Sequence, residues 1–164
     1  MTQADKGEIL HILLVEDNSS HAEIIKRSFE QHNVPNQITH LTDGQTALDY
    51  LFEEGEYKNL ACEIPHLILL DLRLPKIDGL EVLKHIKTHQ GLNKIPVVIL
   101  STSAAEIDVA RAYECHANSY LVKPMDYDKF SKLIADLGQY WMSWNQDPWD
   151  DDKLNPELSI KDLV

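Results

Sequence analysis

Five short apolar or β-branched segments recur along the 164-residue chain, and this feature constrains its fold more than any other. The stretches between them carry apolar residues at helical spacing, so that strands and helices alternate. Such alternation is typical of a parallel sheet with helices on its faces. The predicted strands are Ile9–Val15, Gln37–Leu41, His66–Asp71, Pro96–Leu100 and Ser119–Val122.

Right-handed crossovers over a parallel sheet leave few possible strand orders. We predict an α/β, doubly wound five-stranded parallel sheet of order 2-1-3-4-5, the flavodoxin-like arrangement. The first helix is expected to open after Asn18, where Ser20 and Glu23 stand at the spacing of a capping box.

Three segments are expected along the chain. Residues 1–8 form an N-terminal arm, residues 9–144 one globular domain, and residues 145–164 an acidic C-terminal tail. Two prolines, Pro148 and Pro156, and a triple aspartate interrupt any periodic pattern in this tail.

Charge and composition exclude several classes of function. The net charge is −12 and the chain has no run of Lys or Arg, which argues against binding to nucleic acid. The apolar runs are too short to cross a bilayer, and no N-terminal pattern marks a secretion signal. We therefore expect a cytoplasmic protein with neither a membrane nor a nucleic acid as partner.

Polar residues close four of the five predicted strands. They are Glu16–Asp17, Asp71, Ser101 and Lys123. Because the carboxyl ends of parallel strands share one edge of the sheet, these residues should converge. Three carboxylates would repel one another, so the Lys123 ammonium and a divalent cation are the expected counter-charges. Mg²⁺ with a phosphoryl group would suit such a site, and a carboxylate could then act as a nucleophile.

Four motifs carry a resemblance to a known family. "LLVEDN", "LILLDLRLPKIDG", "PVVILSTS" and "SYLVKP" follow one another in order over roughly Ile9 to Trp141. In this the chain resembles the receiver domain of two-component response regulators. The stretch "ALDYLFEEGEY" and the "STS" after the fourth strand further resemble single-domain regulators that partner bacterial phytochrome histidine kinases.

The resemblance implies a role for each residue that matches a motif. Asp71 would be the phosphoacceptor. The implied Mg²⁺ ligands are Asp17, Asp71, the backbone carbonyl of Arg73 and, through a water molecule, Glu16. The chain departs from the family at two positions, because Glu16 stands where many relatives have Asp and Arg73 stands where Asn is frequent.

The resemblance also implies how the signal is passed on. Ser101 and Lys123 would contact the phosphoryl group, and Ser101 and Tyr120 would form the switch. Pro124 would follow a cis peptide bond.

These features predict a single-domain response regulator that accepts a phosphoryl group from a histidine kinase onto Asp71 and relays it by conformational change. It would not be an enzyme beyond its own phosphorylation and dephosphorylation. An alternative is a receiver-like binding module that acts without phosphorylation. An aspartyl-phosphate phosphatase would place a second Asp two residues after the nucleophile, where this chain has Arg73.

The last predicted helix carries more apolar residues than packing on a sheet requires. Its stripe consists of Phe130, Ile134, Leu137 and Trp141, widened by Leu133, Tyr140 and Trp144. We predict that this face forms a homodimer. The alternative is that the acidic tail covers it through Trp149 or Leu154, since large apolar patches are rarely left exposed.

Overall fold

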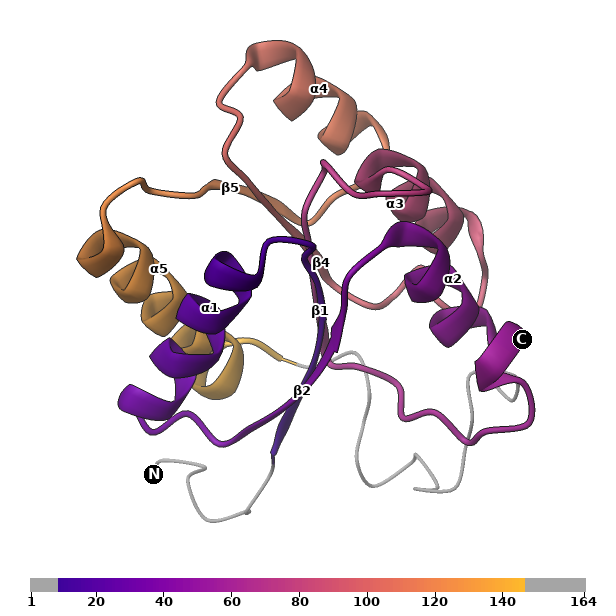
Figure 1. The fold of residues 1–164 in the computed structure, drawn as a ribbon, viewed down its shortest axis with the longest axis horizontal. Coiled ribbons are helices and arrows are strands. Elements are labelled where there is room, and N and C mark those ends of the chain that lie inside the picture. Colours follow the sequence, from indigo (N-terminus) through magenta and orange to yellow (C-terminus); the bar gives the residue numbers. More distant parts are fainter. Residues whose placement is uncertain (1–8, 147–164) are drawn as a thin grey trace.

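The computed structural model describes residues 9–146 and shows a five-stranded parallel sheet between two layers of helices (Figure 1). The strand order is β2-β1-β3-β4-β5, which confirms the predicted fold. The predicted N-terminal arm and most of the predicted tail, including Trp149 and Leu154, lie outside the described residues.

The elements follow the predicted alternation. The strands are β1 (Leu10–Val15), β2 (Asn36–Leu41), β3 (Leu67–Leu70), β4 (Val97–Ser101) and β5 (Ser119–Val122). The α-helices are α1 (Ser19–Gln31), α2 (Gly44–Phe52), α3 (Gly79–Thr88), α4 (Glu106–Glu114) and α5 (Tyr127–Gln139). A 3₁₀ turn, η1 (Gly55–Tyr57), follows α2, and a π-helical turn, η2 (Tyr140–Trp144), follows α5.

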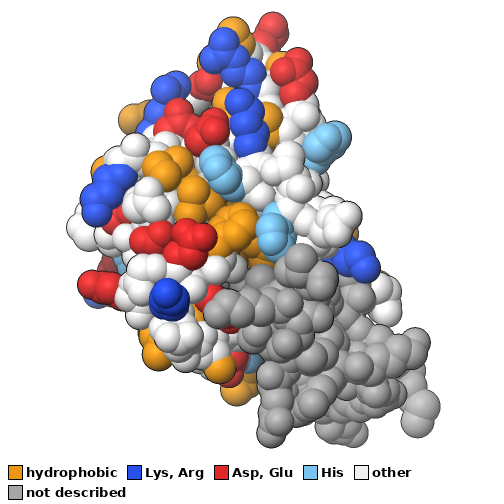
Figure 2. Space-filling model, turned by 90° about the vertical axis from the view of Figure 1, so that its right-hand side faces the viewer, with side chains coloured by type: hydrophobic (Ala, Val, Ile, Leu, Met, Phe, Trp, Pro, Cys, Tyr) orange, Lys and Arg blue, Asp and Glu red, His pale blue; other side chains and the backbone are white. Residues whose placement is uncertain are grey.

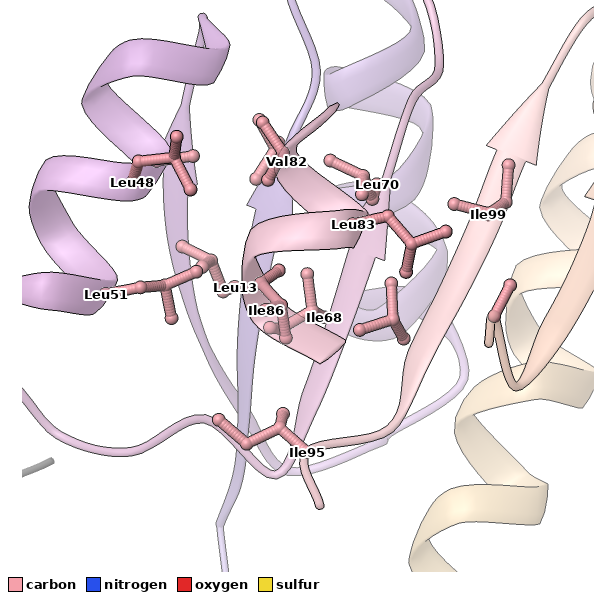
Figure 3. Packing of buried hydrophobic residues seen from close by; sticks show 14 of the residues in the cluster. Leu13, Leu48, Leu51, Ile68, Leu70, Val82, Leu83, Ile86, Ile95 and Ile99 are labelled. Carbon is pink, nitrogen blue, oxygen red and sulfur yellow. The ribbon is translucent and has the colours of Figure 1, made fainter. Parts of the chain in front are cut away.

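The sheet separates two apolar clusters because successive side chains of a strand point to opposite faces. Along β1, Leu13 and Val15 pack with α2 and α3, whereas Ile12 and Leu14 pack with α1 and α5. Figure 3 shows Leu51 of α2 pointing toward Leu13. Burial on both faces explains why β1, β3 and β4 are nearly continuous apolar runs in the sequence.

The start of α1 differs in one detail from the prediction. The N-cap is Asn18, whose side-chain oxygen accepts a hydrogen bond from the His21 backbone N–H at 3.0 Å. Ser20 lies inside the helix, and Glu23 instead accepts a hydrogen bond from the Arg27 side chain at 2.8 Å. The predicted capping box is therefore wrong, because Asn18 caps the helix two residues before Ser20.

The bond before Pro124 also differs from the prediction. No peptide bond in residues 9–146 is cis, so the expected cis bond between Lys123 and Pro124 is wrong. The trans form is the intrinsically preferred isomer of an X–Pro bond. In this form the Lys123 N–H still donates to the Ser101 carbonyl oxygen at 2.7 Å, which holds the end of β5 on β4.

The side of the molecule covered by α2 and α3 carries both signs of charge. Figure 2 shows basic and acidic side chains interspersed there around a small hydrophobic patch. On the described part of this face we see no extended basic surface. Within residues 9–146, moreover, none of the helices has the length and apolar character needed to span a membrane.

Gly79 allows the loop after β3 to fold back against the start of α3. A Cβ atom at this position would lie 2.0 Å from the Asp71 carbonyl oxygen and 2.7 Å from the Leu72 Cα. The Gly79 N–H donates to the Leu72 carbonyl at 2.9 Å, so the two backbone segments are in direct contact. A glycine is required here because any side chain would push this loop away.

We predict that Gly79→Ala lowers the free energy of unfolding by about 1–3 kcal/mol, the usual cost of forcing extra atoms into a packed site. Urea denaturation measures this change. The matched control is Ser19→Ala at the exposed first position of α1, which should change stability by less than about 0.5 kcal/mol. A Gly79→Ala variant as stable as the wild type would contradict the close approach.

Candidate functional site

The carboxyl ends of the strands bring the predicted polar residues together at one edge of the sheet. Glu16 follows β1, Asp71 follows β3, Ser101 ends β4 and Lys123 follows β5. All four are buried, although each is polar or charged. Because burying charges is unfavourable unless they are paired, the contacts among these residues decide what the site can do.

The Lys123 ammonium lies at the centre of the site. Its Nζ is 2.5 Å from Glu16 Oε2 and 2.8 Å from Asp71 Oδ2, while only 2% of the Lys123 side chain is exposed. The third neighbour is the imidazole of His21 on α1, with Nζ 3.2 Å from Nδ1. Since an ammonium has three N–H donors, all of them are used.

Two side chains beside Lys123 have shifted pKa values. Burial raises the pKa of the Glu16 carboxyl to about 7, although the hydrogen bond and the charge of Lys123 act in the opposite direction. Burial and the neighbouring Lys123 charge lower the pKa of His21. A neutral His21 fits its position, because Nδ1 can then accept a hydrogen bond from Lys123.

Three carboxylates form a cluster at this edge. Glu16, Asp17 and Asp71 each offer one oxygen, and these oxygens lie within 4.8 Å of one another. Asp17 is exposed, whereas the Glu16 carboxylate is held from both sides by the Asn18 N–H and Lys123. Hard divalent cations prefer such oxygen donors, so these residues fit a divalent metal.

The loop after β4 joins Ser101 to Tyr120 by hydrogen bonds. Ser101 Oγ accepts from the Ser103 N–H at 3.1 Å, and the Tyr120 hydroxyl on β5 donates to the Ser103 carbonyl at 2.8 Å. The two predicted switch residues therefore contact the same residue, Ser103.

Arg73 lies near Asp71, as expected, but its side chain turns to α4. Its backbone N–H donates to Asp71 Oδ1 at 3.1 Å, while its guanidinium Nη2 lies 3.2 Å from Asp108 Oδ2. Sequence reasoning missed Asp108 and His21. The start of α1 after Asn18 could have indicated that His21, in the first turn, lies near the site. No sequence motif indicated Asp108.

The fold and this arrangement of residues define a receiver domain. A family model described as the response regulator receiver domain matches residues 12–135, and the chain belongs to this family. Its members act in relays that depend on phosphorylation.

Several individual proteins are similar over most of their length. The probable methanogenesis regulatory protein FilR2 of Methanothrix harundinacea is 45% identical over 151 residues, which cover 88% of this chain and 95% of that protein. Response regulator Rcp1 of Synechocystis is 40% identical over 131 residues, covering 80% of this chain and 88% of Rcp1.

Solved structures give the same picture. The phosphorylated cyanobacterial phytochrome response regulator RcpA superposes with a TM-score of 0.81 at 39% identity, over 87% of this chain and all of that one. The Mn²⁺-bound form of Rcp1 has a TM-score of 0.80 at 38% identity, over 85% of this chain and 99% of that one. The similarity to single receiver proteins of phytochrome systems is thus present in both sequence and structure.

We predict that Lys123→Met lowers the free energy of unfolding by about 3–5 kcal/mol without a divalent cation, because Glu16 and Asp71 lose their counter-charge in a buried site. Adding Mg²⁺ or Mn²⁺ should restore part of this loss, since a ligand that binds only the folded state stabilises it. Urea denaturation with and without the cation measures both effects.

The matched control for this variant is Lys132→Met, which removes an exposed ion pair with Asp136 at 2.7 Å. It should change stability by less than about 1 kcal/mol, independently of the cation. Equal losses in the two variants would show that the central ammonium does not have the role assigned to it.

Proposed function

We propose that Asp71 accepts a phosphoryl group from the phosphohistidine of a histidine kinase, with Mg²⁺ as the cation. One observation carries this proposal: a buried Lys123 ammonium links Asp71 to Glu16 directly beside the Asp17 carboxylate. The alternative, a binding module that is never phosphorylated, has no need of such a cluster. Retention of all three carboxylates and the lysine favours phosphorylation.

Each site residue has a distinct task in this proposal. A carboxylate oxygen of Asp71 forms the new bond to phosphorus while the bond to the kinase imidazole breaks, and the imidazole nitrogen keeps the electron pair. Asp17, Asp71 and the Arg73 carbonyl would hold Mg²⁺ directly, and Glu16 would act on it through a water molecule. When bound, the cation neutralises charge on the carboxylates and the phosphoryl group. Lys123 and Ser101 donate hydrogen bonds to the phosphoryl oxygens.

The output would be a conformational change passed through Ser103. When Ser101 Oγ turns to donate to a phosphoryl oxygen, its contact with the Ser103 N–H weakens. As Ser103 moves, the hydrogen bond that the Tyr120 hydroxyl donates to its carbonyl changes as well. This is the role proposed for Ser101 and Tyr120 as switch residues.

The partner is proposed to be a phytochrome-type histidine kinase. Support comes from the phytochrome response regulator RcpA, which aligns along its full length with this chain. We also propose a cytoplasmic location, where such a kinase would present its phosphohistidine.

We predict that acetyl phosphate labels the protein at Asp71 only when Mg²⁺ is present, because the carboxylate cluster otherwise repels the phosphate. Mass spectrometry of the intact protein and of its peptides detects the label. Asp71→Asn should abolish labelling, whereas Asp136→Asn, an exposed control on α5, should leave it unchanged. Labelling without Mg²⁺, or persistent labelling of Asp71→Asn, is the result that would refute the assignment.

The homodimer predicted from the sequence also remains a proposal, on a smaller surface than expected. Phe130 and Ile134 are buried in the core between α1 and the sheet, so they are not available to a partner. Beside them a groove of about 510 Å³ lies between β5 and the end of α5. Its apolar lining comes from Val98, Leu121, Leu133, Leu137, Tyr140 and Trp141.

Two aromatic side chains of η2, after the end of α5, are exposed to solvent. Tyr140 is 51% exposed and Trp144 is 76% exposed. The Trp141 indole nitrogen is buried without a hydrogen-bond partner among the described residues. A second copy of the chain would cover this face and could supply the missing acceptor.

We expect the wild type to sediment as a dimer at about 50 μM, a concentration at which even a micromolar association is populated. Tyr140→Glu/Trp144→Glu should sediment as a monomer, because two charges would be buried at the interface. The control is Leu60→Glu, a similarly exposed leucine before β3 and outside this groove. A monomeric wild type, or a double variant that stays dimeric, would rule out this interface.

A further inference from the structure

An ion pair joins the loop after the phosphoacceptor to α4. Arg73 Nη2 lies 3.2 Å from Asp108 Oδ2, and the Asp108 side chain is only 17% exposed although that of Arg73 is 75% exposed. The two residues are 35 positions apart in the sequence. The pair therefore links two segments that the sheet itself does not connect.

Asp108 is fixed by a second and shorter contact. The Ser103 hydroxyl donates to the same oxygen, Asp108 Oδ2, at 2.6 Å. Ser103 is also the residue that contacts both Ser101 and Tyr120. The carboxylate of Asp108 thus lies where the β4–α4 segment, the switch residues and the loop carrying Arg73 meet.

The other end of this connection is Asp71 itself. The backbone N–H of Arg73 donates to Asp71 Oδ1 at 3.1 Å, so the guanidinium belongs to a residue already in contact with the acceptor. A phosphoryl group on Asp71 would add about two negative charges and three acceptor oxygens next to it. An ion pair as exposed as that of Arg73 contributes little to stability, so the guanidinium can exchange partners.

We propose that Asp108 is a positioning residue that holds the Arg73 guanidinium on α4 while Asp71 is unmodified. When Asp71 carries a phosphoryl group, the guanidinium leaves Asp108 and binds that group instead. Asp108 then keeps only the Ser103 hydroxyl, and the β4–α4 segment loses its link to the loop after β3. The inference rests on the proposed function and adds to it two groups, Asp108 and the side chain of Arg73, that the roles assigned above do not use.

Binding of beryllofluoride with Mg²⁺, a stable analogue of the phosphoryl group, tests the exchange by titration calorimetry. Asp108→Asn frees the guanidinium and should raise the affinity about twofold to fivefold, the range expected for one exposed ion pair. Arg73→Gln should lower the affinity by a similar factor. The double variant should match Arg73→Gln, because the asparagine amide oxygen can still accept from the Ser103 hydroxyl and only the contact with Arg73 is lost.

A matched control separates this exchange from a general effect of charge. Glu106→Gln removes an exposed carboxylate from the same turn of α4 and should leave the affinity within about 1.5-fold of the wild type, since exposed charges are screened. If Asp108→Asn raises the affinity equally in the wild-type and Arg73→Gln backgrounds, the effect is one of charge alone and the inference is overturned.

The Arg73 Nε–H resonance in an NMR spectrum reports on the guanidinium without any measure of activity. It should shift on Asp108→Asn in the protein without beryllofluoride, and it should shift on addition of beryllofluoride to the wild type. A resonance that moves in neither experiment would overturn the inference while leaving the proposed function intact. Failure of the wild type to bind beryllofluoride at all would overturn the proposed function and the exchange with it.

Discussion

The contact of Lys123 with two buried carboxylates is the interaction on which the site depends. Neighbouring strands lie about 4.8 Å apart, so the ends of β5 and β1 are separated by about three such spacings. A long side chain is needed to cross this distance, and Lys123 reaches past the end of β4 to contact both Asp71 and Glu16. The Lys123 ammonium offsets the cost of burying these carboxylates, and it also links the ends of β1, β3 and β5.

The saturation of this ammonium has a consequence for any new ligand. Lys123 has only three donors, and Glu16, Asp71 and His21 already use them. In the proposed function, a phosphoryl oxygen that binds Lys123 would therefore replace one of these acceptors. Hydrogen bonds to carboxylates are stronger than those to neutral groups, so the imidazole, which also lies farthest at 3.2 Å, is the acceptor most readily given up. Because His21 is in the first turn of α1, such an exchange would remove a contact between Lys123 and the start of that helix.

Local patterns were enough to predict the sheet and the residues at its edge. Every strand was placed to within one residue. Burial on both faces gives β1, β3 and β4 a clear apolar run, whereas β2 and β5 are only partly buried. The convergence of Asp71, Ser101 and Lys123 followed from the parallel topology alone. The capping box at Ser20 was wrong because two capping signals overlap in the sequence, and only the backbone of Asn18, extended at φ −81° and ψ 110°, decides between them.

What the sequence could not predict are contacts between side chains far apart along the chain. Lys87 shows this well: its ammonium donates to the Ile95 carbonyl at 2.8 Å and to the Asn118 side chain, 31 residues away, at 2.9 Å, although its position in α3 suggests an ordinary exposed lysine.

The apolar face of α5 gives a second example. The periodicity of the sequence predicts this face, but it does not predict which of its residues are buried and which are exposed. Phe130 and Ile134 are buried between α1 and the sheet, whereas Tyr140 and Trp144 are exposed beyond the end of α5. The elements that pack against α5 therefore decide which part of its apolar face is core and which part is surface. This division cannot be predicted from the sequence of α5 alone.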